Sequence, residues 1–178
     1  ILQVLGVALT MLAGGKDTTT GLLGHAAEAL TAHRDQRAVL AQDPACLPGA
    51  VEELLRLASP VQGLARTTTC DVEIGGRTIP EGRKVLMLYA SANRDRRAFG
   101  PDAEELDVRR PVGTIMTFGY GAHHCIGAAV ARMVGRVALS ELLARFPAFE
   151  VDAERGEFAA GNYVRRYRTL PFAPHGFG

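Results

Sequence analysis

Residues 118–127 read Phe-Gly-Tyr-Gly-Ala-His-His-Cys-Ile-Gly, and the rest of the chain is interpreted outward from this stretch. Gly119 and Gly121 lack a Cβ atom, so the backbone there can adopt positive φ angles and let a flat ligand approach closely. Cys125 follows at the point where the glycine-rich stretch gives way to an apolar run. The sequence therefore predicts a loop that presents one cysteine.

A helix is predicted from Gly127 to Phe146, because the residues between them are mainly apolar and Pro147 ends the run. Cys125 would then stand at the start of this helix. Unpaired backbone N–H groups and the positive end of the helix dipole stabilise a thiolate there. A cysteine in this position is a good metal ligand.

Two other interpretations of this cysteine remain open at this point. A lone cysteine often serves as a small buried apolar residue. The adjacent His123 and His124 also suggest zinc, although no second Cys-x-x-Cys or His-x-x-x-His group supplies the four ligands of a typical structural site.

Length and composition exclude several classes of protein. A chain of 178 residues is long enough for one ordinary domain. Its 20 basic and 19 acidic residues are almost balanced, so we expect neither nucleic acid nor an anionic membrane as a partner. The uncharged stretch 1–15 is shorter than the ~20 residues of a membrane span. Three scattered cysteines do not form a disulfide framework, which favours a reducing cytoplasm.

The first part of the chain predicts an interrupted helix. Residues 1–12 are apolar on every face, which is typical of a buried helix. Gly14 and Gly15 then disfavour regular helix, since each glycine costs about 1 kcal/mol relative to alanine. A helix end at this point, with Asp17 or Thr18 capping the next helix, is the simplest interpretation from the residues alone.

The middle of the chain changes from helix to strand. After Pro48 a short helix carries Glu53 and Arg56 three residues apart, and periodicity alone makes them an exposed ion pair. Alternating residues in 65–89 predict strands with a hairpin turn at Gly75-Gly76. An irregular stretch follows over 90–117. Further strands are expected over 149–151 and 158–170, with a turn at Gly161-Asn162.

The order Phe-Gly-x-Gly-x-His-x-Cys-x-Gly over residues 118–127 resembles the haem-binding signature of the bacterial cytochrome P450 family. The resemblance implies a mainly α fold with small β-sheets, in which residues 1–178 form a single haem-binding region. It implies that Cys125 is the thiolate ligand of the iron of haem b, with His123 and Arg66 facing the haem propionates. The resemblance implies that the remaining haem-binding positions are Phe118, Gly119, Gly121, Gly127, Gly14 and Gly15.

Two further motifs are similar to those of the family. Residues 14–19 resemble the oxygen-binding groove, which makes Thr18 the hydroxyl that hydrogen-bonds dioxygen and Asp17 the acid of a proton relay. Glu53 and Arg56 resemble a Glu-x-x-Arg motif that is buried in the family and joined by a second arginine, here Arg110. We expect these three residues to have a structural role, since breaking a buried charged cluster is strongly destabilising.

The sequence also departs from the family pattern. Ile115 stands where many bacterial members carry a propionate-binding histidine, and Pro111 follows Arg110 without the usual intervening residue. Members are roughly twice as long, so the resemblance implies that the N-terminal half of the family fold is lacking and that a complementary N-terminal chain would complete it.

Three hypotheses follow. The first is a monooxygenase region that takes electrons from a ferredoxin or flavoprotein and oxidises a small apolar organic substrate. The second is a truncated, non-catalytic protein that acts as a binding or interaction module. The third is a small metal-binding protein with a zinc thiolate site and no haem.

Overall fold

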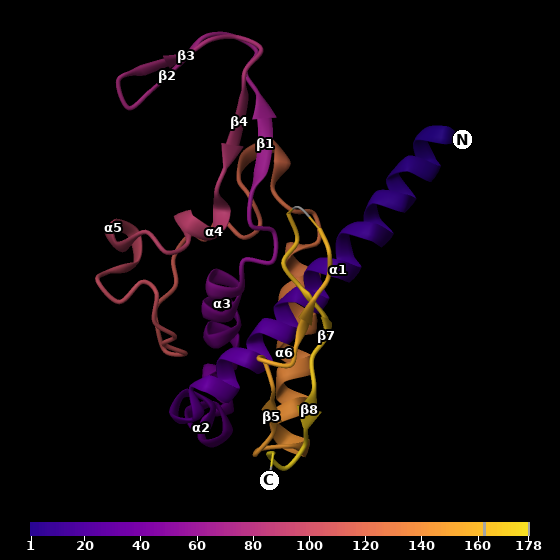
Figure 1. Ribbon diagram of the computed structural model, residues 1–178, viewed down its shortest axis with the longest axis vertical. Coiled ribbons are helices and arrows are strands. Elements are labelled where there is room, and N and C mark those ends of the chain that lie inside the picture. Colours follow the sequence, from indigo (N-terminus) through magenta and orange to yellow (C-terminus); the bar gives the residue numbers. More distant parts are fainter. Residues whose placement is uncertain (162, 178) are drawn as a thin grey trace.

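The computed structural model describes residues 1–161 and 163–177, so Asn162 of the expected C-terminal turn lies outside the described residues. Helices dominate and small sheets surround them, as expected (Figure 1). The helices are α1 (Leu2–Ala32), α2 (Arg34–Gln42), α3 (Leu47–Ala58), α4 (Tyr89–Ala92), α5 (Arg96–Phe99) and α6 (Ala128–Arg145). Two short 3-10 turns, η1 (Pro44–Cys46) and η2 (Gly121–His123), precede α3 and α6.

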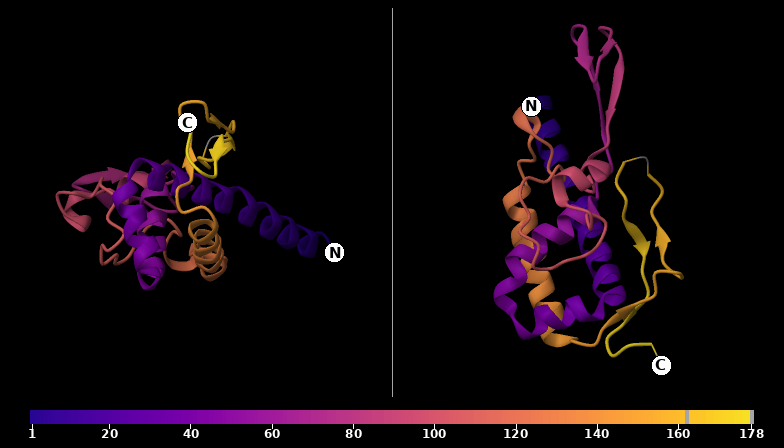
Figure 2. Two further views of the ribbon diagram at one scale, coloured as in Figure 1. Left: turned by 90° about the horizontal axis from the view of Figure 1, so that it is seen from below. Right: turned by 90° about the vertical axis from the view of Figure 1, so that its left-hand side faces the viewer.

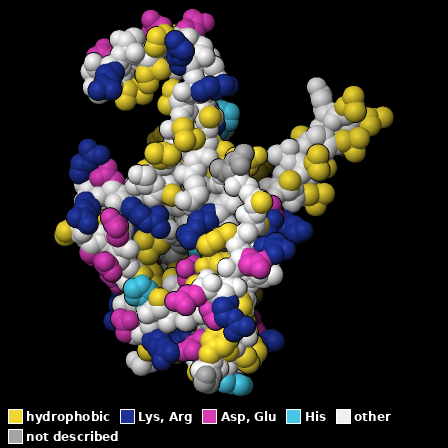
Figure 3. Space-filling model, viewed as in Figure 1, with side chains coloured by type: hydrophobic (Ala, Val, Ile, Leu, Met, Phe, Trp, Pro, Cys, Tyr) yellow, Lys and Arg dark blue, Asp and Glu magenta, His cyan; other side chains and the backbone are white. Residues whose placement is uncertain are grey.

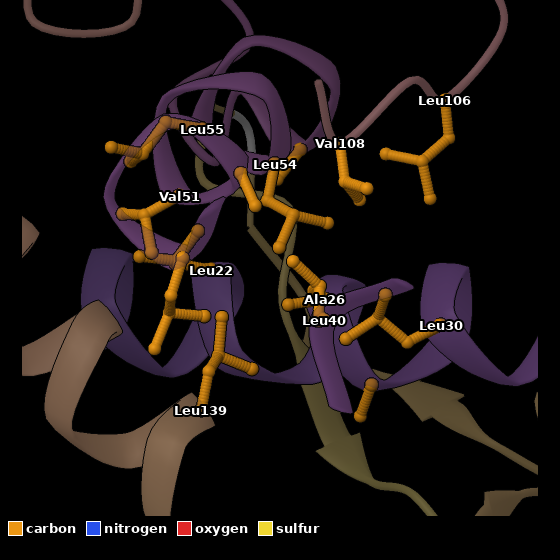
Figure 4. Packing of buried hydrophobic residues seen from close by; sticks show 14 of the residues in the cluster. Leu22, Ala26, Leu30, Leu40, Val51, Leu54, Leu55, Leu106, Val108 and Leu139 are labelled. Atoms are coloured by element: carbon orange, nitrogen blue, oxygen red, sulfur yellow. The ribbon is translucent and has the colours of Figure 1, made fainter. Parts of the chain in front are cut away.

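The core lies where the second half of α1 meets α2, α3 and α6 (Figure 4). Leu22, Leu54 and Leu139 are each at most 2% exposed and come from three different helices. Leu106 and Val108, from the irregular stretch after α5, close the cluster from the side of α3. Burial of such side chains contributes about 1.5–3 kcal/mol each, so this contact holds the helices together.

Each of the four sheets contains two antiparallel strands. They are formed by β1 (Leu64–Thr67) with β4 (Lys84–Met87), β2 (Val72–Ile74) with β3 (Arg77–Ile79), β5 (Glu150–Val151) with β8 (Phe172–Ala173), and β6 (Glu157–Phe158) with β7 (Tyr167–Thr169). The predicted turn between β2 and β3 is confirmed, because Gly75 and Gly76 both have positive φ angles. This hairpin extends away from the helices (Figures 1 and 2).

The first helix corrects two expectations. It runs through Gly14 and Gly15 without a break, and neither Asp17 nor Thr18 caps a new helix. The hydroxyl groups of Thr18 and Thr20 donate to the carbonyl groups four residues earlier, 2.7 and 2.9 Å away, which keeps these polar groups satisfied inside the helix.

The expected burial of residues 1–12 is also wrong. The large apolar side chains of this stretch are between 59% and 98% exposed. Figure 3 shows them on an arm that projects from the body of the molecule. Among residues 1–161 and 163–177, no helix is long and apolar enough to cross a membrane.

Candidate functional site

The cysteine loop is shaped by two glycines and closed by backbone hydrogen bonds. Gly119 and Gly121 have φ angles of 70° and 67°, a conformation that a side chain would strain. The amide of Gly119 donates to the Met116 carbonyl (2.8 Å), and the amide of Cys125 donates to the Phe118 carbonyl (2.8 Å). The loop therefore holds Cys125 just ahead of α6, where its thiol is free and exposed.

The neighbouring residues of the loop leave this thiol accessible. An added Cβ at Gly127 would lie 3.8 Å from the Cys125 sulfur, and one at Gly121 would meet nothing within 4 Å. Ile126, the next residue, is 88% exposed, and Tyr120, earlier in the loop, is 79% exposed. The thiol itself is exposed, so the interpretation of Cys125 as a buried apolar residue is wrong.

Phe118 anchors the loop to the helices beneath it. Its ring is buried, and the guanidinium of Arg132 lies 4.5 Å from the ring centre. Arg132, on α6, in turn donates two hydrogen bonds to the carboxylate of Glu52 on α3, at 2.5 and 3.0 Å. These bonds to Glu52 are the main cause of the raised pKa of Arg132, and burial of the guanidinium acts in the opposite direction. Sequence reasoning missed Arg132, because its partners lie in distant parts of the chain.

Gly14, Gly15, Asp17 and Thr18 lie on α1, where the helix passes from its exposed arm into the core. An added Cβ at either glycine would meet nothing within 4 Å. The carboxylate of Asp17 pairs with Arg166 rather than Lys16, with 3.2 Å between Oδ1 and Nε. In Figure 1 and in the right-hand view of Figure 2, the N-terminal part of α1 and the cysteine loop extend toward the end of the molecule that carries β1 and β4. No hydrogen bond or ion pair between described residues links the α1 segment to Cys125.

Glu53, Arg56 and Arg110 form a buried charged cluster. Arg56 donates to both carboxylate oxygens of Glu53, at 2.6 and 2.7 Å, and Arg110 Nε donates to the same carboxylate at 3.1 Å. Glu53 and Arg56 are both 0% exposed, so the exposed ion pair expected from periodicity alone is wrong. Arg110 also pairs with Asp102, an interaction that raises the pKa of Arg110 and lowers that of Asp102. The adjacent Pro111 does not displace Arg110 from the cluster.

The two residues expected to face the haem propionates, Arg66 and His123, make few contacts with the rest of the chain. Arg66 lies in β1, and its guanidinium donates to the neighbouring Ala65 carbonyl at 3.0 Å, with no ion pair to any described residue. His123 ends the 3-10 turn η2 and is exposed. Ile115 packs in the hydrophobic core at 7% exposure, so it offers no polar group at the position of the family histidine.

The residues around Cys125 do not match the ligand set of a structural zinc site. In the part of the chain that the structure describes, no group of three or more His, Cys, Asp and Glu residues lies close enough together to hold a metal ion. A thiolate with no neighbouring protein ligands instead suits a metal whose other ligands come from a macrocycle. The free sulfur and the open space beside Gly121 fit that kind of cofactor.

A mainly helical fold with a free, exposed thiol in a glycine-shaped loop before its last long helix defines a candidate site for a thiolate ligand. The chain belongs to the cytochrome P450 family, since the family model described as Cytochrome P450 matches residues 3–157. Membership in this family implies a haem-thiolate cofactor, and the cysteine loop lies inside the matched range.

Individual relatives agree with the family assignment. The chain is 60% identical over 171 residues to Cytochrome P450 130 of Mycobacterium tuberculosis (strain CDC 1551 / Oshkosh), a match that covers 96% of this chain and 42% of the relative. It is 39% identical over 172 residues to Vitamin D(3) 25-hydroxylase of Pseudonocardia autotrophica, covering 95% and 42% of the two chains. This chain therefore spans less than half the length of these relatives.

Solved structures show the same fold. The P450 monooxygenase TamI, bound to tirandamycin C, matches with a TM-score of 0.88 and 43% identity over 93% of this chain and 42% of its own. CYP109E1 of Bacillus megaterium, in complex with testosterone, matches with a TM-score of 0.91 and 29% identity over 97% of this chain and 48% of its own. The fold predicted from the sequence is thus confirmed as part of the cytochrome P450 fold.

Proposed function

We propose that this chain is the haem-thiolate region of a cytochrome P450 monooxygenase, with Cys125 as the axial ligand of haem b. The observation that carries the proposal is the free, exposed thiol of Cys125, held at the start of α6 by a loop with two positive-φ glycines. The bond from the Cys125 amide to the Phe118 carbonyl closes the loop on which this residue stands. When bound, a haem with thiolate ligation would supply cleavage of the O–O bond of dioxygen.

The chain's own residues have distinct roles in this proposal. Gly119, Gly121 and Gly127 keep side chains away from the face on which a flat macrocycle would lie. Arg66 and His123 have no carboxylate partner among the described residues, and both carry N–H groups that could hydrogen-bond anionic propionates. Glu53, Arg56 and Arg110 hold the segment before the loop in place and take no part in the chemistry.

Asp17 and Thr18 would move protons on the opposite side of the cofactor. The Thr18 hydroxyl donates to Gly14, so its oxygen lone pairs remain available to accept a hydrogen bond from water or a bound ligand. The Asp17 carboxylate is half-exposed and paired with Arg166, so it can exchange protons with solvent when that pair opens. Gly14 and Gly15 leave room beside these groups.

The substrate in this proposal is a small apolar organic molecule, and electrons come from a separate ferredoxin or flavoprotein. The names of the relatives support this substrate class, since one is a hydroxylase of vitamin D(3) and one solved structure holds testosterone. The three free cysteines suit a reducing compartment such as the cytoplasm. Because the relatives are longer, a complementary N-terminal part would supply the rest of the substrate pocket.

A carbon monoxide spectrum of the reduced, haem-loaded chain tests the assignment of Cys125. We expect the strongly red-shifted Soret band of thiolate ligation, and we expect Cys125→Ser to lose that band. Cys70→Ser is the matched control, because Cys70 is also exposed and free but lies next to the β2–β3 hairpin. A red-shifted band that survives Cys125→Ser would refute the assignment.

The alternative, a binding or interaction module without oxygenase activity, is favoured by one observation. The apolar first part of α1 is exposed, which is a surface suited to a protein partner. In that case no haem spectrum would appear after reconstitution, whereas the monooxygenase proposal requires one.

A further inference from the structure

Asn93 is a buried polar residue that neither the sequence motifs nor the charged cluster explains. It directly follows α4, which lies next to α3 (Figure 1), and it is 0% exposed. Its backbone is tied on both sides, because its amide donates to the Tyr89 carbonyl (3.0 Å) and its carbonyl accepts from Arg56 (2.7 Å). Because buried polar groups are normally hydrogen-bonded, the side-chain amide of Asn93 needs partners within the fold.

The Asn93 side chain connects α3 with the segment that enters the cysteine loop. Its Nδ2 group donates to the hydroxyl of Ser59, just after α3, at 2.7 Å, and to the hydroxyl of Thr117 at 2.8 Å. Its Oδ1 atom accepts from the backbone amide of Met116 at 2.7 Å. One side chain therefore makes three hydrogen bonds to two segments that are far apart in the sequence.

The direction of these bonds is determined by the two hydroxyl groups. Ser59 donates its only hydroxyl hydrogen to the Arg56 carbonyl (2.7 Å), and Thr117 donates its own to the Leu55 carbonyl (2.8 Å). Each hydroxyl can therefore only accept a hydrogen bond from Asn93. The position therefore requires a short side chain with two N–H donors and one acceptor. Among the standard residues, only asparagine has such a side chain.

The segment that Asn93 holds is the first part of the cysteine loop. The Met116 carbonyl accepts from the amide of Gly119 (2.8 Å), and the Phe118 carbonyl accepts from the amide of Cys125 (2.8 Å). A series of hydrogen bonds thus runs from the buried Arg56, through Asn93, to the residue that carries the thiol. The loop has no other side-chain hydrogen bond to α3 or α4 at residues 116–125 within the described chain, apart from that of Thr117 to Leu55.

We infer that Asn93 is a positioning residue for Cys125. Through Asn93, the charged cluster of α3 sets the conformation of the cysteine loop. The inference rests on the proposed function only in taking Cys125 as the haem ligand. The positioning itself is a property of the chain without cofactor, so it can be tested separately.

Amide hydrogen exchange in the cofactor-free chain, comparing wild type with Asn93→Asp, tests the positioning. Aspartate has the same shape and keeps the acceptor for Met116, but it places a carboxylate against two hydroxyl oxygens that have no free hydrogen. We expect the amides of Gly119 and Cys125 to exchange about tenfold faster or more, while amides of α6 such as Leu139 change much less.

Gln36→Met is the matched control. Gln36 on α2 also holds a loop through its side-chain amide, since its Oε1 atom accepts from the backbone amide of Val108 at 3.0 Å. This bond lies outside residues 116–125, so its loss should speed exchange at Val108 and leave Gly119 and Cys125 unchanged. Should Asn93→Asp fail to fold, Thr117→Val removes one acceptor of the Asn93 amide with little change in shape and is expected to speed exchange at the same two amides.

The outcomes separate this inference from the proposed function. Uniform acceleration across all helices in Asn93→Asp, or unprotected Gly119 and Cys125 amides in the wild-type chain, would overturn the role of Asn93. A second measurement uses the haem-loaded chain, in which Asn93→Asp should reduce the fraction that shows the red-shifted band and Gln36→Met should not. Absence of that band in the wild type would count against the proposed function, and the exchange rates would still decide the role of Asn93.

Discussion

Replacement of Glu53 by glutamine is expected to destabilise the fold by several kcal/mol. The carboxylate is 0% exposed and accepts from Arg56 at 2.6 and 2.7 Å and from Arg110 at 3.1 Å. Glutamine keeps the shape but turns an N–H₂ group toward a guanidinium and leaves the charge of Arg56 unpaired. Removing one partner of a buried ion pair costs about 3–5 kcal/mol. This is a large fraction of the ~5–15 kcal/mol by which domains are stable.

Urea denaturation followed by circular dichroism measures this cost, and Glu141→Gln is the matched control. Glu141 pairs with Arg145 at 2.7 Å on α6, but both side chains are more than half exposed. Such a pair contributes about 0.3–0.5 kcal/mol, so its loss should barely change the denaturation midpoint. Equal midpoints for the two variants would refute the reasoning, because they would show that the charges of the cluster are not buried together.

A double replacement separates the ion pair from the other bonds of Arg56. Replacing both partners of a buried pair by apolar residues is often neutral or stabilising. Here Arg56 also donates to the carbonyls of Asn93 (2.7 Å) and Ala103 (2.5 Å). Glu53→Leu with Arg56→Met would leave both carbonyls unpaired, at a cost of about 1–3 kcal/mol each. Wild-type stability in the double variant would show that these carbonyl contacts contribute nothing.

Two predictions concern α1. Thr18→Ala should leave the urea midpoint nearly unchanged, because the hydrogen bond that is lost, to the Gly14 carbonyl, is local. In the complete enzyme the same change should increase the hydrogen peroxide released per electron pair consumed. An unchanged peroxide yield would contradict the proton-relay role. Burial lowers the pKa of His25 below 6.5, so stability should fall as the pH drops below ~6.5. His25→Phe should remove the dependence of stability on pH between about pH 7.5 and 5.5. If the urea midpoint of this variant still changes with pH over that range, the dependence comes from another residue.

The sign of the His25 effect follows from its surroundings. The ring packs against Phe158 and Tyr167, its Nδ1 atom is 2.7 Å from the Gly21 carbonyl, and its Nε2 atom has no partner among the described residues. Burial is the main effect, and the positive charge of Arg165 acts in the same direction. The folded chain therefore favours the neutral ring, while the unfolded chain binds a proton more readily at the same pH.

Local features of the fold were predictable from the sequence. The helix after the cysteine loop was predicted within about two residues at each end, because Pro147 and the apolar run are local signals. The turn at Gly75-Gly76 depends only on two residues that tolerate positive φ. β8 (Phe172–Ala173) was missed, since its two residues lie beyond the last alternating stretch of the sequence.

The exposure of α1 could not be predicted in the same way. Apolar residues on all faces of a helix favour burial, but periodicity does not show which segment packs against the helix. The Gly14-Gly15 pair disfavours helix locally, yet the flanking turns continue through it and Thr18 satisfies the Gly14 carbonyl. Residue propensities alone could not predict that the helix continues, because its continuity across the glycine pair depends on the turns on both sides.

The difference between local and long-range contacts also explains why the sequence predicted only part of the candidate site. The features that would bind a cofactor, Cys125 and its glycines, act through neighbours within a few residues, so their spacing carries information. The features that hold the loop act between residues far apart, such as Asn93 with Ser59 and Thr117, and no local pattern marks them. A single asparagine between two hydroxyl groups has the same sequence signature as any polar turn residue. The directions of its hydrogen bonds, which are known only from the folded structure, distinguish Asn93 from such a turn residue.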